Sequence, residues 1–346
     1  DRNVVISTDR DGVELVYVSG DIGFVSREQK TEGRFFGTQA QGESFGYASG
    51  GLLQPPVPNP NVDTIDKFPF SSDTNASDVG DLTLAKSELA GVSSSVSGYA
   101  LGGRNPFPAQ PSPDIRDTIE KFPFAVDTNA TDVANLIEPV SSSGPNGQVS
   151  QTSGYHSGGN TQITPRVRTD RIQKFLFATD SNATDVGNLL GGYAGQAGAS
   201  SSVSGYVMGG FDHPPGSTTN TIQKFPFSSD TNASDVGNLT ESVGNNGGCS
   251  SSTFGYRTGG TSDPPVRDTI DKFPFSSDAN ATDVGNLTAT TSGMATQSST
   301  VSGYSSGGAS GPRINDIQKF PFASDSNTTD VGDLTSARNT AAGQQV

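Results

Sequence analysis

A repeated phrase constrains this chain more than any other feature. The segment Thr64-Ile-Asp-Lys-Phe-Pro-Phe70, with the Asp- and Asn-rich text that follows it, occurs six times at intervals of 54, 53, 50, 48 and 47 residues. A second signature, Gly-Tyr-x-x-Gly-Gly, keeps step with it, and its tyrosines are Tyr47, Tyr99, Tyr155, Tyr206, Tyr256 and Tyr304. A period of about 50 residues means that one supersecondary unit has been copied, so the fold is built from such units.

Each unit contains four strand-like segments. In the second unit these are residues 91–95, 97–103, 117–122 and 131–136, and clusters of Gly, Pro, Asn and Asp separate them. Short strands between such clusters are typical of all-β proteins, and no stretch of the unit has helical periodicity. Four antiparallel strands per unit, repeated around an axis, describe a β-propeller blade. The sequence therefore predicts an all-β propeller.

The double glycine after an aromatic strand, as in Gly98-Tyr-Ala-Leu-Gly-Gly103, resembles the kelch repeat over nearly the whole chain. The resemblance implies a kelch-like propeller in which this pair closes the second strand of each blade. A kelch blade usually carries a Trp on its fourth strand, whereas this chain has none and has Val79 and Leu82 there. The Lys-Phe-Pro-Phe phrase is also similar to repeat-rich propeller proteins of marine bacteriophages, which implies a virion component.

The ends of the chain set the predicted number of blades. Residues 34–42 match the first strand of a blade, so six blades of about 47–54 residues run over 34–335. The tail, 336–346, is a seventh copy of that first strand, and residues 1–33 contain three strand-like runs. We therefore predict a single propeller over 1–346 with seven blades, the last formed by 1–33 and 336–346, which leaves no open seam. The alternative is a six-bladed ring with 1–33 as a separate arm.

The two faces of such a ring differ in variability. The turns between third and fourth strands are nearly identical in all six units, whereas the loops between second and third strands vary. A rigid scaffold that carries diversified loops is a common design for binding. The variable segments are 52–62, 104–116, 160–170, 211–219 and 261–267, and the candidate binding residues in them are Arg104, Phe107, Arg166, Arg168, Phe211, His213 and Arg267.

The repeated phrase Asp-x-Asn-x-x-Asp has two interpretations. Asp73, Asn75 and Asp78 could supply oxygen ligands to calcium, although a dedicated calcium loop brings more carboxylates. The favoured interpretation is an Asx-type turn, in which Asp73 and Asn75 accept hydrogen bonds from nearby backbone amides. We expect no cofactor, with calcium as the alternative. Lys67 and its five equivalents are predicted to pair with a carboxylate such as Asp78.

Composition and residue inventory argue against several functions. The net charge is −15, which disfavours nucleic acid as a partner, and no apolar run approaches the length of a membrane span. The two histidines, His156 and His213, have no partner at metal-ligand spacing, and Cys249 is the only cysteine. No phosphate-binding loop is present. We therefore predict that the protein is not an enzyme.

These observations and the phage resemblance give a functional hypothesis. We expect a non-enzymatic module on a virion or outside a cell, most simply a phage tail, fibre or capsid-attached protein. Its variable loops would contact a host-surface glycan or protein, or other virion subunits, and a homo-oligomer is compatible with this role. The alternative is a secreted, lectin-like propeller that binds glycans through Phe107 and Phe211.

Overall fold

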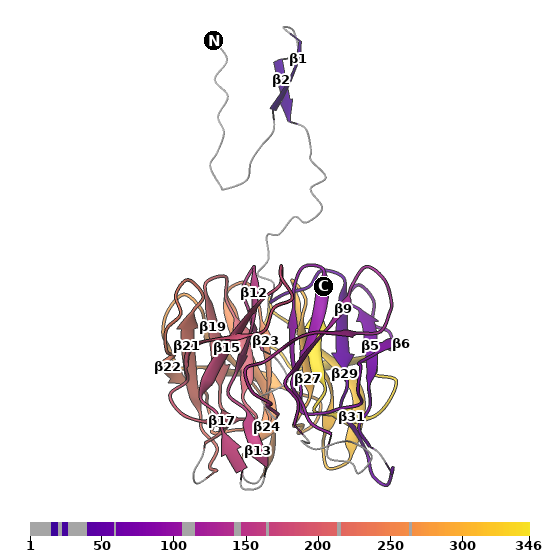
Figure 1. The fold of residues 1–346 in the computed structure, drawn as a ribbon, viewed down its shortest axis with the longest axis vertical. Helices are drawn as coiled ribbons and strands as arrows, with labels where there is room; N and C mark the ends of the chain where they lie inside the picture. The colour runs from indigo at the N-terminus through magenta and orange to yellow at the C-terminus, as the bar shows by residue number, and fades with distance from the viewer. Residues whose placement is uncertain are drawn as a thin grey trace. The chain divides into compact units, whose positions relative to one another are not determined.

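The computed structural model describes residues 40–58, 60–105, 115–141, 147–163, 166–212, 216–262 and 265–346, with the strand backbones of 15–19 and 23–26. The side chains of residues 162, 163 and 166 are outside this description. The chain divides into two compact units, Asp1–Phe36 and Gly37–Val346. In the first unit, β1 (Leu15–Ser19) and β2 (Gly23–Ser26) pair antiparallel with each other (Figure 1).

Six four-stranded antiparallel sheets in the second unit are the propeller blades (Figure 1). Blade 1 contains β32 (Ala342–Gln345), β3 (Phe45–Ser49), β5 (Thr64–Pro69) and β6 (Ser77–Asp81). Blade 2 contains β7 (Ala90–Ser93), β8 (Ser97–Leu101), β9 (Thr118–Pro123) and β10 (Thr131–Asn135). Blade 3 contains β11 (Gln148–Val149), β12 (Ser153–Ser157), β15 (Arg171–Leu176) and β16 (Thr184–Asn188).

The remaining blades repeat this order from the innermost to the outermost strand. Blade 4 contains β18 (Ala197–Ser200), β19 (Ser204–Met208), β21 (Thr221–Pro226) and β22 (Ser234–Asn238). Blade 5 contains β23 (Gly247–Ser250), β24 (Phe254–Thr261), β25 (Val266–Pro274) and β26 (Thr282–Asn286). Blade 6 contains β27 (Ala295–Ser298), β28 (Ser302–Ala309), β29 (Arg313–Pro321) and β30 (Thr329–Asp333).

The innermost strands lie around one axis and close a ring. Each contacts the innermost strand of the next blade, in the order β7, β11, β18, β23, β27, β32 and back to β7. The all-β propeller is therefore confirmed, with the six blades of the alternative prediction. The seventh blade is wrong, because the C-terminal strand that it requires belongs to blade 1. Of the strands expected within 1–33, the parts other than β1 and β2 fall outside the described residues.

The C-terminal tail supplies the first strand of blade 1. β32 pairs antiparallel with β3, with Ala342 opposite Ser49 and Gln345 opposite Gly46. The sequence assigns this place to residues 34–42, and that assignment is wrong. Residues 34–39 lie outside the described part of the chain, and the end of the segment lies elsewhere, because Gly42 forms a parallel bridge with Ser299 beside blade 6.

Packing about the axis gives the physical reason. A Cβ atom on Gly91 of blade 2 would lie 2.2 Å from the carbonyl oxygen of Gly343, and one on Gly248 would lie 2.2 Å from that of Gly198. Adjacent inner strands thus approach backbone to backbone at these two seams, and glycine at positions 91 and 248 permits the approach. The tail supplies the Gly343 carbonyl that meets Gly91, whereas the described end of the competing segment bonds to Gln345 of the tail and to Ser298 of blade 6.

Aromatic side chains join each blade to the next. The ring of Tyr47 in blade 1 stacks on that of Phe124 in blade 2, with centroids 5.0 Å apart, and meets Phe122 at 5.5 Å. Burial of such rings is a main source of stability in a core. The other five seams repeat the stacked pair as Tyr99–Phe177, Tyr155–Phe227, Tyr206–Phe275, Tyr256–Phe322 and Tyr304–Phe70. The spaced aromatic residues of the sequence therefore form the core between blades.

The hydroxyl of Tyr47 differs from its equivalents, and this leads to a prediction. The Tyr99 hydroxyl lies beside the hydrogen-bonding groups of Ser94 and Lys121, whereas Val346 takes the place of that serine in blade 1. The buried Tyr47 hydroxyl meets no partner among the described residues. Because an unpaired buried hydroxyl costs about 1–3 kcal/mol, Tyr47→Phe should leave the free energy of unfolding unchanged or raise it. Tyr99→Phe should lower it by about 1 kcal/mol.

Urea denaturation of the two variants beside the unmodified protein measures this difference. Both substitutions remove the same atom from equivalent places, so each variant is the control for the other. Equal destabilisation by Tyr47→Phe and Tyr99→Phe would mean that the Tyr47 hydroxyl does have a partner.

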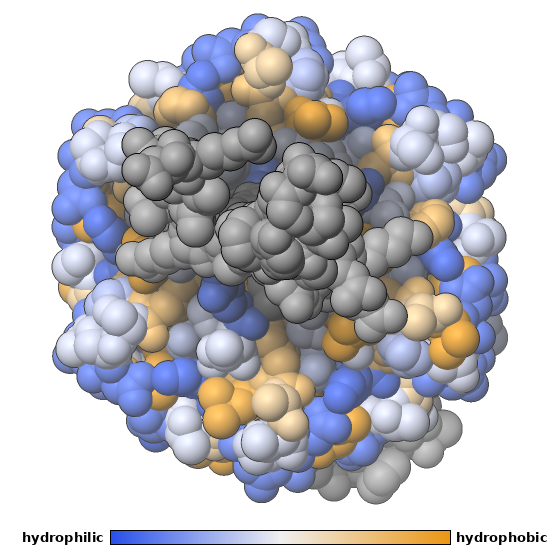
Figure 2. All heavy atoms as spheres, turned by 90° about the horizontal axis from the view of Figure 1, so that it is seen from above, coloured by the Kyte–Doolittle hydropathy of each residue, from blue (hydrophilic) through white to orange (hydrophobic). Residues whose placement is uncertain are grey.

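The two ends of the ring differ in kind. We call one end the turn face: it carries the turns between first and second strands and between third and fourth strands, such as 94–96 and 124–130 in blade 2. Figure 2 views it, and hydrophilic residues lie around its rim with hydrophobic ones between them. We call the other end the loop face: it carries the loops between second and third strands and the links between blades.

Candidate binding face

On the loop face, every link between blades pairs with the loop of the blade that follows it. β31 (Arg338–Asn339) pairs with β4 (Leu52–Leu53), and β17 (Tyr193–Ala194) pairs with β20 (Phe211–Asp212). Isolated bridges take the same place at the other four seams, between Ser87 and Arg104, Ser141 and Asn160, Gly244 and Thr261, and Ser292 and Ala309. The base of each loop is therefore held by the backbone at six equivalent points.

Beyond these anchors the loops differ from blade to blade. In blade 1, residues 54–58 form an exposed proline-rich tip, whereas in blade 6 the chain turns within Ser310–Pro312. In blade 3 the loop continues as a hairpin of β13 (Asn160–Ile163) and β14 (Arg166–Arg168). The tips of blades 2, 4 and 5 include 106–114, 213–215 and 263–264, which lie outside the described residues. One repeated frame thus carries loops of different length and content.

Two of the predicted binding residues, Arg168 and Phe211, contact each other between blades 3 and 4. The Arg168 guanidinium donates a hydrogen bond to the carbonyl oxygen of Asp212, and it lies 6.0 Å from the centroid of the Phe211 ring. A Cβ atom on Gly244 would lie 2.3 Å from that ring. Phe211 is therefore half-buried against an arginine and a link, and both side chains contact the loop base.

Two other predicted binding residues form ion pairs within the chain. Arg104 lies 3.3 Å from Glu88, and Arg267 lies 2.7 Å from Glu241, each carboxylate coming from the link before the blade. These arginines therefore attach loops to links. Arg166 lies in β14, but its side chain is not described, and the predicted residues Phe107 and His213 lie outside the described part of the chain.

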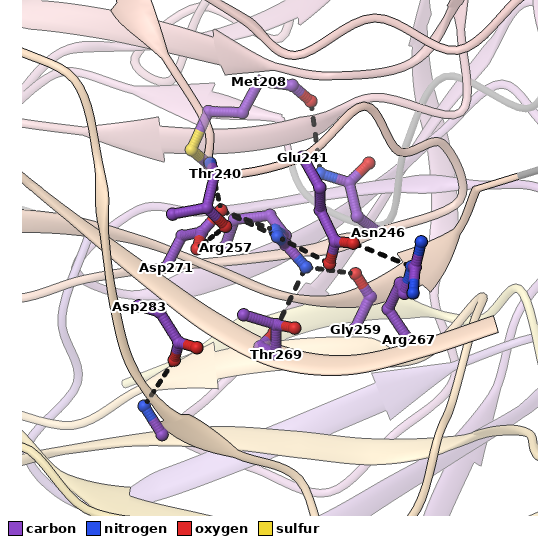
Figure 3. A network of polar contacts seen from close by, with 11 residues as sticks. Met208, Thr240, Glu241, Asn246, Arg257, Gly259, Arg267, Thr269, Asp271 and Asp283 are labelled. Carbon is purple, nitrogen blue, oxygen red and sulfur yellow. Dashed lines mark hydrogen bonds and ion pairs between the residues drawn. The ribbon is translucent and has the colours of Figure 1, made fainter. Parts of the chain in front are cut away.

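Arg267 belongs to a polar network in blade 5 (Figure 3). Arg257 of β24 is fully buried and lies 2.7 Å from the carboxylate of Asp271 on β25. Glu241 joins the two arginines, since its oxygens lie 3.3 Å from Arg257 and 2.7 Å from Arg267. The sequence did not single out Arg257, which stands where the other blades have Ala, His, Val or Ser.

Asp271 occupies a position that is buried and polar in every blade. Its side-chain oxygen accepts a hydrogen bond from the backbone N–H that follows the last leucine of the preceding blade. The distances are 2.6–3.1 Å at all six seams. The acceptor and donor pairs are Asp66 and Thr335, Glu120 and Thr83, Gln173 and Ile137, Gln223 and Leu190, Asp271 and Thr240, and Gln318 and Thr288.

Where this position carries an acid, a buried cation lies beside it. The pairs are Asp66 with Arg338 at 3.0 Å, Glu120 with Lys86 at 2.7 Å, and Asp271 with Arg257 at 2.7 Å. Where it carries Gln173, Gln223 or Gln318, the residue equivalent to Lys86 and Arg338 is Val140, Tyr193 or Thr291. A buried carboxylate without a cation is costly, which explains why the two charges occur together. The alternation between an acid and Gln at this position is visible in the sequence and was a signal for the buried ion pairs.

On the turn face, the repeated lysines pair across the seams. Lys67 lies 2.8 Å from Asp127 of the next blade, whose carboxylate is about half exposed. The equivalents are Lys121–Asp180, Lys174–Asp230, Lys224–Asp278, Lys272–Asp325 and Lys319–Asp73. Pairing with a carboxylate is confirmed, but the partner is the first Asp of the next blade's turn and not the equivalent of Asp78.

The three calcium candidates have three different protein partners. Asp73 accepts from Lys319, and Asn75 accepts from the backbone N–H of Asp333 at 3.1 Å, both across the seam with blade 6. Asp78 accepts from the N–H of Gly80 within its own strand. The repeated phrase therefore ties each blade to the one before it, and the predicted hydrogen bonds from nearby backbone amides to Asp73 and Asn75 are wrong. Among the described residues no group of three or more His, Cys, Asp or Glu could hold a metal ion.

A small, partly open pocket lies at the axis among the described residues. Its volume is about 30 Å³, and inner-strand glycines and serines such as Ser200 and Ser250 line it. The hydroxyl of Ser250 accepts a hydrogen bond from the N–H of Ser200 at 2.9 Å, so it joins two blades. A space of this size holds one or two water molecules, which is too little for an organic substrate.

His156 and Cys249, the other reactive side chains weighed in the sequence, are both buried. Burial raises the pKa of the Cys249 thiol to about 12, and the thiol donates to backbone oxygens of the next blade. A thiol in this setting behaves as a small core residue. His156 lies in β12, in the interior between blades, away from the loop tips.

Comparisons with known proteins leave the family open. No family model matches the chain, and no relative was found among curated proteins. The described residues include no helix of the length and apolarity that a membrane crossing requires. What the structure shows is the propeller itself; the resemblance to kelch repeats and to phage proteins remains a prediction.

Proposed function

We propose that the protein is a non-enzymatic binding module and that it binds through the tips of its loop face. The observation that carries this is the contrast between six equivalent loop anchors and the different tips beyond them. On the turn face, by contrast, the repeated Asp, Asn and Lys side chains are engaged in contacts between blades. Their near identity has a structural cause, and the diversity of the loop tips has none in the described contacts.

The finer proposal follows from the phage resemblance. It is a kelch-like virion component, in a tail, a fibre or attached to a capsid, whose loop tips meet a host-surface glycan or protein or a neighbouring subunit. The lectin-like alternative relies on aromatic loop residues. Since Phe211 already packs against Arg168 and Gly244, Phe107 is the better candidate for stacking on a sugar.

A loop-trimmed variant tests the proposal. Each tip is replaced by the short Ser310-Gly-Pro312 turn of blade 6, with the anchors left in place. We expect an unchanged far-ultraviolet circular dichroism spectrum together with loss of binding on a glycan array and to isolated cell-surface preparations. The matched control, Lys224→Met on the turn face, should bind as the unmodified protein does. Retained binding by the loop-trimmed variant, or loss of binding by Lys224→Met, would mean that the binding site is not on the loop face.

A further inference from the structure

One seam of the ring contains an uncompensated imidazole. His156 lies opposite Gln173 in the register of β12 and β15, and Gly154, two residues earlier on the same strand, faces Val92 of blade 2. The imidazole is fully buried, and neither nitrogen has a hydrogen-bond partner among the described residues. The equivalent residues at the other seams are Ala48, Ala100, Val207, Arg257 and Ser305.

Blade 5 shows what a cation at this position needs. Arg257 has Asp271 at 2.7 Å and Glu241 at 3.3 Å, so its buried charge meets two carboxylates (Figure 3). In blade 3 the place of Asp271 is taken by the neutral Gln173. The oxygen of Gln173 accepts from a backbone N–H, and its amide nitrogen has no partner among the described residues. A protonated His156 would therefore lie beside the neutral amide of Gln173, whereas Arg257 lies beside the carboxylate of Asp271.

The charged groups around His156 are engaged elsewhere. Three strands that contact β12 or lie next to it in the seam, β7, β8 and β11, carry no charged residue. On β15, Lys174 pairs with Asp230 of blade 4, and Arg171 pairs with Asp185 and with Glu138 of the link. Glu138, the equivalent of Glu241, is thus held by Arg171. These carboxylates are therefore not free to compensate an imidazolium, and no carboxylate contributes to the pKa of His156.

We infer that the seam between blades 2 and 3 is the acid-sensitive joint of the ring, which opens when His156 takes up a proton. An unpaired charge in an apolar interior is unfavourable, and separation of the two blades gives the imidazolium access to water. Protonation and opening are coupled, because the open seam binds the proton more tightly than the closed one.

The pKa of His156 agrees with this geometry. Burial lowers it from 6.5 to about 4, and the residue's own backbone offsets this only in part. Since the pKa in the closed ring lies below that in the open one, the seam has its full stability above pH 6.5. It loses stability as the pH falls from 6.5 to 4. The opening equilibrium should rise about 30-fold at pH 5, and by up to about 300-fold below pH 4.

Amide hydrogen exchange tests the inference with controls inside the same molecule. At the seam between blades 2 and 3, the N–H of Ala183 donates to the carbonyl oxygen of Asn135. Corrected for intrinsic exchange, its protection relative to the other seams should fall about 20-fold from pH 7 to pH 5. The equivalent amides, which serve as the controls, are those of Ala76, Ala130, Ala233, Ala281 and Thr328.

Two substitutions copied from other blades decide the cause. His156→Val, which reproduces Val207, should remove the difference between Ala183 and its equivalents. Gln173→Asp, which reproduces Asp271, should keep Ala183 protected at pH 5, because the imidazolium then has a carboxylate beside it. Equal loss of protection at all six seams, or a selective loss that persists in His156→Val, would overturn the inference.

Discussion

Replacement of Arg338 by valine is expected to lower the free energy of unfolding by about 3–5 kcal/mol, because it leaves the buried carboxylate of Asp66 without its cation. The two groups lie 3.0 Å apart and both are fully buried. Arg338 also donates to the carbonyl oxygen of Ala48 on β3. Since Arg338 begins the segment that closes the ring, exchange protection should fall first in β32. Urea denaturation and amide exchange measure the two effects.

The matched control copies another blade. Asp66→Gln combined with Arg338→Val reproduces Gln173 and Val140, so the acid and its cation are removed together. The side-chain oxygen of the new glutamine can still accept the hydrogen bond that Asp66 accepts from the backbone N–H of Thr335, as Gln173 does in blade 3. We expect the double variant to recover most of the lost stability. If it is no more stable than Arg338→Val alone, the unpaired charge is not the cause of the loss.

The repeat itself could be predicted from the sequence because its determinants are local. The double glycines, the Tyr47 series and the Phe124 series recur at fixed spacing, which indicates blades, and the contrast between constant turns and variable loops indicates two unlike faces. Closure of the ring could not be predicted in this way. Residues 34–42 and the tail both match an inner strand, and contacts between residues far apart in the sequence decide which of the two pairs with β3.

The candidate site was harder to predict than the fold. Arg104, Arg168 and Arg267 lie in variable loops. The sequence does not distinguish an arginine that faces solvent there from one that contacts a neighbouring link. The structure shows that each engages a group of its own chain. Lys86 and Arg338 are the converse case. Each pairs with an acid on the next blade, at a position where other blades have Gln. This pairing across a seam is visible in the sequence only when the six units are aligned.

Valine at position 248 should disrupt the ring more than any loop substitution. A Cβ atom on Gly248 would lie 2.2 Å from the carbonyl oxygen of Gly198, and backbone atoms of an inner strand cannot move aside without parting two blades. Overpacking of a well-filled core costs about 1–3 kcal/mol and more where backbone must shift. We expect Gly248→Val to lower the free energy of unfolding by more than about 3 kcal/mol.

The equivalent position in blade 6 provides the control, because Thr296 already carries a β-branched side chain there. Its hydroxyl accepts from the N–H of Gly248 and donates to its carbonyl oxygen, at 3.2 and 2.7 Å. Thr296→Val keeps the volume and loses only these two bonds, so it should cost about 1–2 kcal/mol. Urea midpoints of the two variants separate steric crowding from lost hydrogen bonding. If Gly248→Val changed the free energy of unfolding by less than about 1 kcal/mol, the inner strands would be able to move apart without opening the ring.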